Sequence, residues 1–286
     1  MRVDDLLAQG PTRSFEFFPP KSDEESAVLS TTLIDLEPLK PSFVSVTYRG
    51  GRESRQRTFD LVTSIQRDGH LTAMAHLVCV GHRRPEMRDL LERYRAAGVQ
   101  NVMSLGGDLP DDPALVESDF AHAIDLVELV REVGPFAVGV AAHPAGHPRS
   151  PDLASDRRHL AEKLAAADFA VTQFFFEAAQ WRRLVEELAE HGVTKPVLPG
   201  IMPVTTLSGI SRMAAMGAPV PSALVARLEA AQLRGGPSAV RAEGIAAAVE
   251  LCRELLEGRA PGLHFYTLNR STATREIHAA LFGATR

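Results

Sequence analysis

Seven polar side chains stand at or just after the ends of apolar, strand-like runs, and their types suit acid–base chemistry and ligand binding. Glu16 is flanked by Phe15 and Phe17, and burial among apolar groups is expected to raise the pKa of its carboxyl group. A carboxyl group that stays protonated near neutral pH can act as a general acid. The alternative is a buried glutamate paired with a basic residue. The seven residues are Glu16, Thr47, His76, Asp108, His143, Gln173 and Tyr266.

Three of these residues carry groups that suit a planar, charged ligand. Asp108 follows Gly106 and Gly107, which let the backbone approach a ligand closely, although an aspartate here could simply stabilise a turn. Gln173 offers a donor and an acceptor side by side, which suits the edge of a heterocycle, or it caps a neighbouring loop. Tyr266 could stack on a planar ring or merely fill the top of the fold.

The histidines give little support to a metal site. His143 and His147 are four residues apart, a spacing that suits a metal on a helix, and two prolines exclude a helix there. His76 is either a core histidine or a ligand contact. A metal-dependent hydrolase using these histidines with Asp108 is a rival enzyme class, but it lacks a His-x-His pair at the first strand end. We predict no metal.

The positions of these residues follow from eight predicted strands that alternate with helices. The runs are nearly continuous in apolar residues, as in parallel sheets covered on both faces. This count and length predict a (β/α)₈ TIM barrel, in which ligands bind at the carboxyl ends of the strands. An open doubly wound sheet is the alternative, but no G-x-G-x-x-G motif follows the first strand. The predicted strands are Arg13–Phe18, Ser42–Thr47, Leu71–Val78, Gln100–Leu105, Phe136–Ala142, Phe169–Phe176, Lys195–Ile201 and Gly262–Leu268.

Helical periodicity predicts helices in the segments between several strands, including a helical insertion between strands seven and eight. About 60 residues separate those two strands, roughly twice the usual unit. The insertion forms either a wall of the ligand site or an extra pair of packing helices. Ser238 and Ser271 are the expected N-caps of the last two helices. The predicted helices are Glu86–Ala97, Asp152–Ala167, Gln180–Glu190, Leu207–Met216, Ser222–Gln232, Ser238–Leu256 and Ser271–Phe282.

Composition and charge indicate a single globular domain and give no sign of nucleic-acid binding or membrane insertion. The chain has 286 residues, 45% of them hydrophobic, which supports a large core in a single barrel domain spanning residues 1–286. A formal net charge of −5 provides no electrostatic footprint for nucleic acid. Acidic residues follow Met1 where a signal peptide needs apolar ones, and no apolar run is long enough to span a membrane. We expect a cytoplasmic protein, and its oligomeric state cannot be read from these patterns.

Several segments resemble the methylenetetrahydrofolate reductase family, in the family's order and over almost the whole chain. The FEFFPP and TQFFF strings are specific in combination. They are accompanied by FVSVTY at 43–48, GDLP at 107–110, PGIMP at 199–203 and FYTLNR at 265–270. FEFFPP occupies residues 15–20 and TQFFF residues 172–176.

The resemblance implies a barrel that reduces 5,10-methylenetetrahydrofolate to 5-methyltetrahydrofolate, a product that feeds methionine synthesis, with NADH or NADPH as electron donor. It implies that Glu16 is the acid catalyst and that Asp108 stabilises the positive charge that develops at the pterin. Gln173 would read the folate, with Tyr266 and Arg270 nearby. In the lid segment, Leu207 stands where the family has an aromatic residue. The remaining alternative is a folate binder without activity.

Departures from the family pattern concern FAD, which the family usually holds as a hydride relay. Gly106 stands in place of an arginine, His143 in place of a tyrosine and Ala145 in place of an acid. We therefore expect a flavin-independent enzyme in which NADH, rather than NADPH, passes hydride directly to the folate. The alternative is the same reaction through bound FAD. The expected cofactor-binding residues are Thr47, His76, His143, His147 and Asp156.

Overall fold

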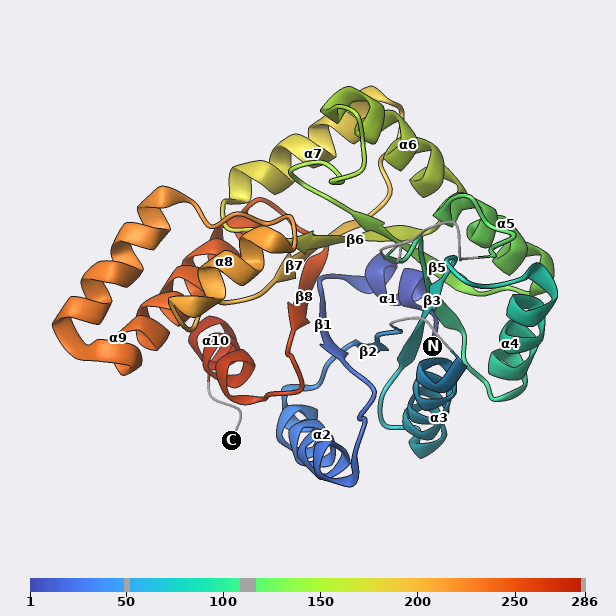
Figure 1. The fold of residues 1–286 in the computed structure, drawn as a ribbon, viewed down its shortest axis with the longest axis horizontal. Coiled ribbons are helices and arrows are strands. Elements are labelled where there is room, and N and C mark those ends of the chain that lie inside the picture. The colour runs from blue at the N-terminus through green and yellow to red at the C-terminus, as the bar shows by residue number, and fades with distance from the viewer. Residues whose placement is uncertain (49–51, 109–116, 284–286) are drawn as a thin grey trace.

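The computed structural model describes residues 1–48, 52–108 and 117–283 and contains a closed barrel of eight parallel strands, each paired with the next along the chain and β8 with β1. This confirms the predicted (β/α)₈ barrel, and Figure 1 views it approximately along the barrel axis. The observed strands lie within a few residues of the predicted ones. They are β1 Thr12–Phe17, β2 Phe43–Val46, β3 Ala73–Val78, β4 Asn101–Leu105, β5 Ala137–Ala142, β6 Phe169–Phe174, β7 Val197–Ile201 and β8 Gly262–Tyr266.

Helices surround the barrel and cover the outer faces of its strands (Figure 1). The last helix begins with Ser271 at the N-cap position, but the Ser271 hydroxyl donates to Asp35 Oδ2 at 2.8 Å and makes no capping bond. The helices are α1 Val3–Gln9, α2 Asp23–Leu36, η1 Glu37–Leu39 (a 3₁₀ turn), α3 Arg52–Asp68, α4 Arg84–Ala96, α5 Ala123–Val133, α6 Leu153–Ala166, α7 Ala178–Glu190, α8 Ser208–Ala215, α9 Ser222–Glu257 and α10 Thr272–Phe282.

Alternation along the strands divides the core into two parts. On β1, Phe15 and Phe17 are fully buried in the layer between strands and helices, while Ser14 and Glu16 point into the barrel. The lower barrel interior is filled by apolar side chains that include Phe43, Met74, Met103, Phe169, Val171 and Leu198. Polar residues are therefore concentrated at the other, carboxyl end of the barrel.

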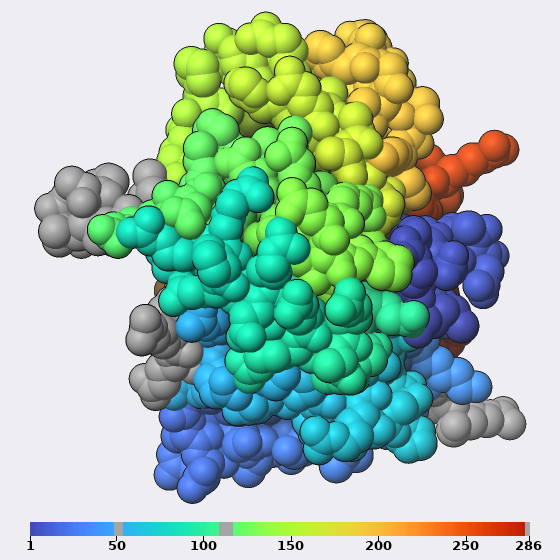
Figure 2. All heavy atoms as spheres, turned by 90° about the vertical axis from the view of Figure 1, so that its right-hand side faces the viewer, coloured from blue at the N-terminus to red at the C-terminus, as the bar shows by residue number. Residues whose placement is uncertain are grey.

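Helix α1 closes the amino end of the barrel. Leu6 and Leu7 pack against the lower interior cluster. The Val3 amide donates to Asn101 Oδ1 at 2.7 Å, and Asn101 Nδ2 donates to the Met1 carbonyl oxygen at 3.1 Å. Figure 2 shows the first residues of the chain in dark blue at one side of the molecule. The opposite end of the barrel is left for the functional residues.

The insertion between β7 and β8 packs over the carboxyl end of the barrel. Its helices α8 and α9 form a cluster with Phe174 of β6, and Leu207 and Tyr266 contact this cluster. Helix α9 contains a kink at Gly235 and Gly236, the latter with φ of 65°, which separates the two predicted helices. Helical geometry resumes before Ser238, so Ser238 lies inside the helix and the expectation that it caps the second helix is wrong.

Gly244 brings the second half of α9 into direct contact with the backbone after β7. A Cβ atom at this position would lie 1.8 Å from the Val204 carbonyl oxygen. We expect Gly244→Val to lower the free energy of unfolding by about 3 kcal/mol or more, because a clash with backbone forces the helix away. Thermal unfolding checks this, with Ala246→Val on the exposed face of α9 as the control. Equal melting temperatures for the two variants would contradict the expected close contact.

No helix within the described residues is long and apolar enough to cross a membrane.

Candidate active site

The closed parallel barrel places the seven predicted polar residues around one mouth, because all carboxyl ends of its strands lie on the same side. Four of the seven lie within strands: Glu16 in β1, His76 in β3, Gln173 in β6 and Tyr266 in β8. Tyr266 is the last residue of β8. Thr47, Asp108 and His143 follow the ends of β2, β4 and β5.

Glu16 is the centre of a buried polar cluster inside the barrel. Its side chain is 8% exposed, and its Oε2 atom lies 3.4 Å from Nε2 of His76 and 3.4 Å from Nε2 of His264. Ser45 Oγ donates to the same oxygen at 3.5 Å. The cluster draws on β1, β2, β3 and β8, so it forms only in the closed barrel.

The pKa of Glu16 is lowered, which contradicts the raised value expected from its apolar sequence neighbours. Burial raises the pKa of this carboxyl group, but the hydrogen bond from His264 and the electrostatic influence of the two neighbouring histidines, His76 and His264, together lower it more. The expectation was wrong because Phe15 and Phe17 point outward, away from the carboxylate. A proton on Glu16 must therefore be supplied by its surroundings.

The segment after β8 holds the Glu16 backbone in place. Thr267 Oγ1 donates to the Glu16 carbonyl oxygen at 2.6 Å. Asn269 accepts from the Phe18 amide at 2.8 Å and donates to the Phe18 carbonyl oxygen at 2.9 Å. Asn269 has φ of 56°, in the left-handed region that asparagine tolerates better than most residues. Residues 265–270 therefore hold the backbone of residues 15–18 in position where β8 pairs with β1.

Asp108 stands at a narrow backbone corner beyond β4, with its side chain exposed at the mouth. Gly107 has φ of 86°, and a Cβ atom there would lie 2.2 Å from Val78 Cγ1, so only glycine fits. Beside this corner lies Arg149, whose Nη2 donates to the Gly107 carbonyl oxygen at 3.3 Å. The same nitrogen lies 3.6 Å from the position of a Cβ on Gly106. A guanidinium group from another loop thus lies at this glycine corner.

The loop after β5 is held by a buried ion-pair group. Asp156, 7% exposed, accepts from the His147 amide at 2.9 Å through Oδ1 and from Arg157 Nη1 at 2.6 Å through Oδ2. Arg157, 3% exposed, also donates to the His143 carbonyl oxygen at 3.1 Å. Its Nε donates to Glu187 Oε2 at 2.6 Å. Asp156, predicted to bind a cofactor, therefore has both oxygens engaged by the protein.

Two histidines and a lysine lie at the same side of the mouth. The rings of His143 and His147 meet edge to face, with centroids 4.7 Å apart. Burial, with smaller contributions from the neighbouring His147 and Lys163, lowers the pKa of His143 to about 4, so it is neutral near pH 7. Burial also lowers the pKa of Lys163 to about 8, and its ammonium group donates to the Ala141 carbonyl oxygen at 2.7 Å.

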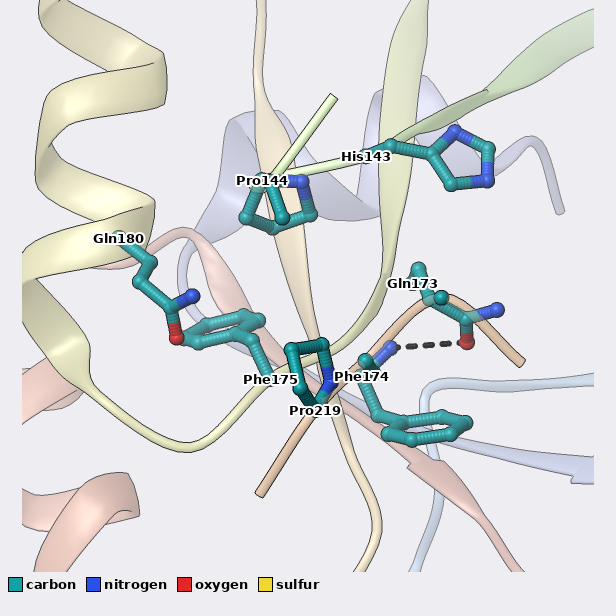
Figure 3. Close-up of a pocket in the computed structure, with 10 residues that line it drawn as sticks. His143, Pro144, Gln173, Phe174, Phe175, Gln180 and Pro219 are labelled. Atoms are coloured by element: carbon teal, nitrogen blue, oxygen red, sulfur yellow. Dashed lines mark hydrogen bonds between the residues drawn. The ribbon is translucent and has the colours of Figure 1, made fainter. Parts of the chain in front are cut away.

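Gln173 lies against the insertion rather than facing an open pocket. Its Nε2 donates to the Met216 carbonyl oxygen at 3.3 Å. Its Oε1 accepts from the Phe174 amide at 3.0 Å, which is the dashed line in Figure 3. Gln173 lines a cavity of about 10 Å³, room for about one water molecule, together with His143 and Pro219. A folate that uses the Gln173 amide therefore has to displace the contact with Met216.

The other predicted residues have distinct surroundings. Tyr266 donates its hydroxyl to the Thr172 carbonyl oxygen at 2.7 Å, so only its ring is available to a ligand. Thr47 is 7% exposed, and its Oγ1 has no hydrogen-bond partner among the described residues. Arg270 is exposed and Leu207 half-buried against the insertion. Thr47 thus offers an unused hydroxyl at the mouth.

Within the described ranges, no three histidine, cysteine, aspartate or glutamate side chains gather closely enough to hold a metal ion.

Sequence reasoning missed several residues of the site. Ser14 and Ser45 stand at inward-facing positions of their strands, a signal that alternation with Glu16 could have revealed. His264 faces inward two residues before Tyr266. Arg149 and Arg157 could not have been found in this way, because their contacts depend on how two loops fold together.

Comparisons with known proteins identify the family of this chain. The family described as "Methylenetetrahydrofolate reductase" matches residues 2–281. The 5,10-methylenetetrahydrofolate reductase of Pectobacterium carotovorum is 33% identical, covering 92% of this chain and 88% of the relative. Methylenetetrahydrofolate reductase (NADH) 1 of Arabidopsis thaliana is 34% identical, covering 94% of this chain and 48% of the relative.

A solved structure supports the fold. A Clostridium thermocellum protein described as binding two copies of 5-methyl-5,6,7,8-tetrahydrofolic acid superposes with a TM-score of 0.70 at 13% identity, covering 98% of this chain and 97% of the other. The low identity limits that likeness to the fold. The match over residues 2–281 and the bacterial relative carry more weight. Taken together, they place this chain in the methylenetetrahydrofolate reductase family.

Proposed function

We propose that this chain reduces 5,10-methylenetetrahydrofolate to 5-methyltetrahydrofolate, with hydride passing directly from NADH to the folate. The observation that carries the proposal is the buried Glu16 carboxyl group held by three polar side chains at the mouth of a family barrel. Its relatives bear the name of this reaction. The reaction consumes one NADH and one proton, and the site provides a group for the proton.

Glu16 and Asp108 have different roles in this mechanism, one as proton donor and the other as the stabilising anion. Opening of the methylene bridge needs a proton on a folate nitrogen and leaves an iminium cation at N5. Glu16 delivers the proton, and the exposed carboxylate of Asp108 at the glycine corner stabilises the cation. Hydride then adds to the exocyclic carbon and leaves a methyl group. Both carboxylates stand at strand ends of one mouth, where a single folate reaches them.

The folate binds against β6, β8 and the insertion in this proposal. The Gln173 amide releases Met216 and reads the pterin edge, while the Tyr266 ring and Leu207 cover its faces. Arg270 is exposed near this region and suits the anionic glutamate tail.

The nicotinamide dinucleotide binds on the β2–β5 side. The unpaired Thr47 hydroxyl and the neutral His143 and His147 rings line this region, and Arg149 provides a cation for the pyrophosphate. NADH is favoured over NADPH in this proposal because Arg55, which follows β2, lies 3.9 Å from the Glu86 carboxylate, which competes with a 2′-phosphate for it. Arg49 and Arg52 also follow this strand; Arg49 lies outside the described residues, and the side chain of Arg52 is not described.

The residues present do not fit FAD by the family's pattern. Gly106, His143 and Ala145 replace three of the expected side chains. Asp156, which matches the family's acid, has its Oδ1 and Oδ2 atoms bonded to His147 and Arg157. We therefore propose a reaction without flavin, and no step passes through one.

One experiment tests both parts of the proposal. The purified protein is expected to lack the visible absorbance of a flavin and to oxidise NADH only when methylenetetrahydrofolate is present. Direct transfer requires both substrates to be bound together, so double-reciprocal plots should intersect. Bound flavin with parallel lines would disprove direct transfer, and no folate-dependent oxidation would disprove the reaction.

Arg149 provides a separate prediction about the dinucleotide. Arg149→Ala should raise the KM for NADH about ten- to a hundredfold at little cost in kcat, because a charge-assisted hydrogen bond to phosphate contributes about 1.5–3 kcal/mol. Steady-state kinetics with saturating folate measures this. Arg158→Ala removes another exposed arginine of the same region, on α6, and should leave KM unchanged. Equal KM values in both variants would remove Arg149 from the dinucleotide site.

A further inference from the structure

A line of hydrogen bonds extends from Glu16 into the barrel, away from the mouth. His264 is 1% exposed, and its Nε2 lies 3.4 Å from Glu16 Oε2. Its other ring nitrogen, Nδ1, lies 2.8 Å from Ser14 Oγ. Ser14 Oγ in turn lies 3.4 Å from the Leu263 carbonyl oxygen. The imidazole therefore bridges the carboxylate and a buried hydroxyl.

The Leu263 carbonyl oxygen determines which atoms of Ser14 and His264 act as hydrogen-bond donors. A carbonyl oxygen only accepts, so the Ser14 hydroxyl donates to it. The Ser14 oxygen then accepts from His264, which places a hydrogen on Nδ1. The Nε2 atom remains as the nitrogen that exchanges a proton with Glu16 Oε2.

We propose that His264 stores the proton that Glu16 delivers to the folate, and that Ser14 selects the ring nitrogen through which this proton passes. The inference rests on the proposed reduction. The N–H bond at Nε2 breaks as an O–H bond forms at Glu16 Oε2, and the carboxyl group then gives that proton to the folate nitrogen. His264 is left neutral with its hydrogen on Nδ1. Water returns one proton to it after product leaves, which matches the one proton consumed per turnover.

The other groups around Glu16 are less suited to this role. Burial lowers the pKa of His76 more than the Glu16 carboxylate raises it, and His264 lowers it further, so His76 is neutral near pH 7. The Tyr266 hydroxyl is bonded to Thr172, and burial raises its pKa well above the usual value. Ser45 contributes only a hydroxyl donor. His264 is the group with both a carboxylate and a hydroxyl on its two nitrogens.

His264→Gln tests the proton store, because glutamine can donate a hydrogen bond to Glu16 but carries no exchangeable charge. We expect kcat to fall at least tenfold, part of the usual contribution of general acid catalysis. The high-pH limb of the kcat profile should also move, because it then reports the Glu16 carboxyl group without the hydrogen bond from His264 that lowers its pKa. Ser14→Ala, a smaller change, should move the same limb as well. The measurement is folate-dependent NADH oxidation across pH.

His278→Gln is the matched control, because His278 is also buried but contacts Arg13 on the far side of β1, outside the mouth. Its pH profile should coincide with that of the wild type. A uniform loss of kcat without movement of the limb in both His264→Gln and Ser14→Ala would overturn the inference and indicate a purely structural role. If the wild type itself shows no folate-dependent oxidation, the proposed function fails instead, so the two failures are distinguishable.

Discussion

Glu16→Gln is expected to lower kcat about a thousandfold while folate affinity stays within a few-fold of the wild type. General acids contribute about 10²–10⁴ in rate, and glutamine keeps the size of the side chain but carries no transferable proton. His76 and His264 would lose the carboxylate between them, yet both can still bond to an amide oxygen. Single-turnover NADH oxidation and folate binding by fluorescence give the two quantities.

The matched control is Glu92→Gln, an exposed glutamate on α4 that should behave as wild type. Near-normal turnover of Glu16→Gln would exclude Glu16 as the acid. A parallel loss of folate affinity by a thousandfold would instead assign Glu16 to substrate binding.

Arg157→Met is expected to have the largest effect on stability, lowering the free energy of unfolding by about 3–5 kcal/mol. Removal of one partner from a buried ion pair leaves an uncompensated charge, here on Asp156, and also releases Glu187. The carbonyl groups of His143 and Pro144 would lose their donor as well. The loop that carries His143 and His147 should therefore lose its fixed geometry, so the KM for NADH should rise.

Arg158→Met, at the neighbouring exposed position, serves as the control in urea unfolding and should change stability by less than about 0.5 kcal/mol. If Arg157→Met unfolds at the same urea concentration as Arg158→Met, the ion-pair group contributes nothing to stability.

The barrel could be predicted from the sequence because its strands are long apolar runs at regular intervals, and these signals are local. The helix boundaries after β5, β6 and β7 agree within two residues for the same reason. Helices α1, α2, α3 and α5 were not predicted individually. The kink in α9 was read correctly as two helices, but Ser238 was misassigned because helical geometry resumes before it.

The candidate site was predictable only in part. Glu16 and Asp108 could be identified as candidates from their neighbours in the sequence. The direction of the Glu16 pKa shift could not be predicted, because His264 is 248 positions away along the chain. The same holds for Arg149, which reaches Gly107 from a loop 42 positions on. Such contacts are determined by the closed barrel and not by local pattern. The roles of the site residues stay predictions until the variants are measured.

The seam between the first and last strands has a consequence for biosynthesis. Thr267 and Asn269 fasten the backbone of residues 16–18, and His264 reaches the Glu16 carboxylate, all from the final strand and the turn after it. During synthesis, Glu16 therefore gains these partners only after β8 has left the ribosome. A nascent chain that ends before β8 can contain most of the helices and still be inactive. The appearance of catalytic activity thus reports the pairing of β8 with β1, which closes the barrel and is a slow, long-range step in folding.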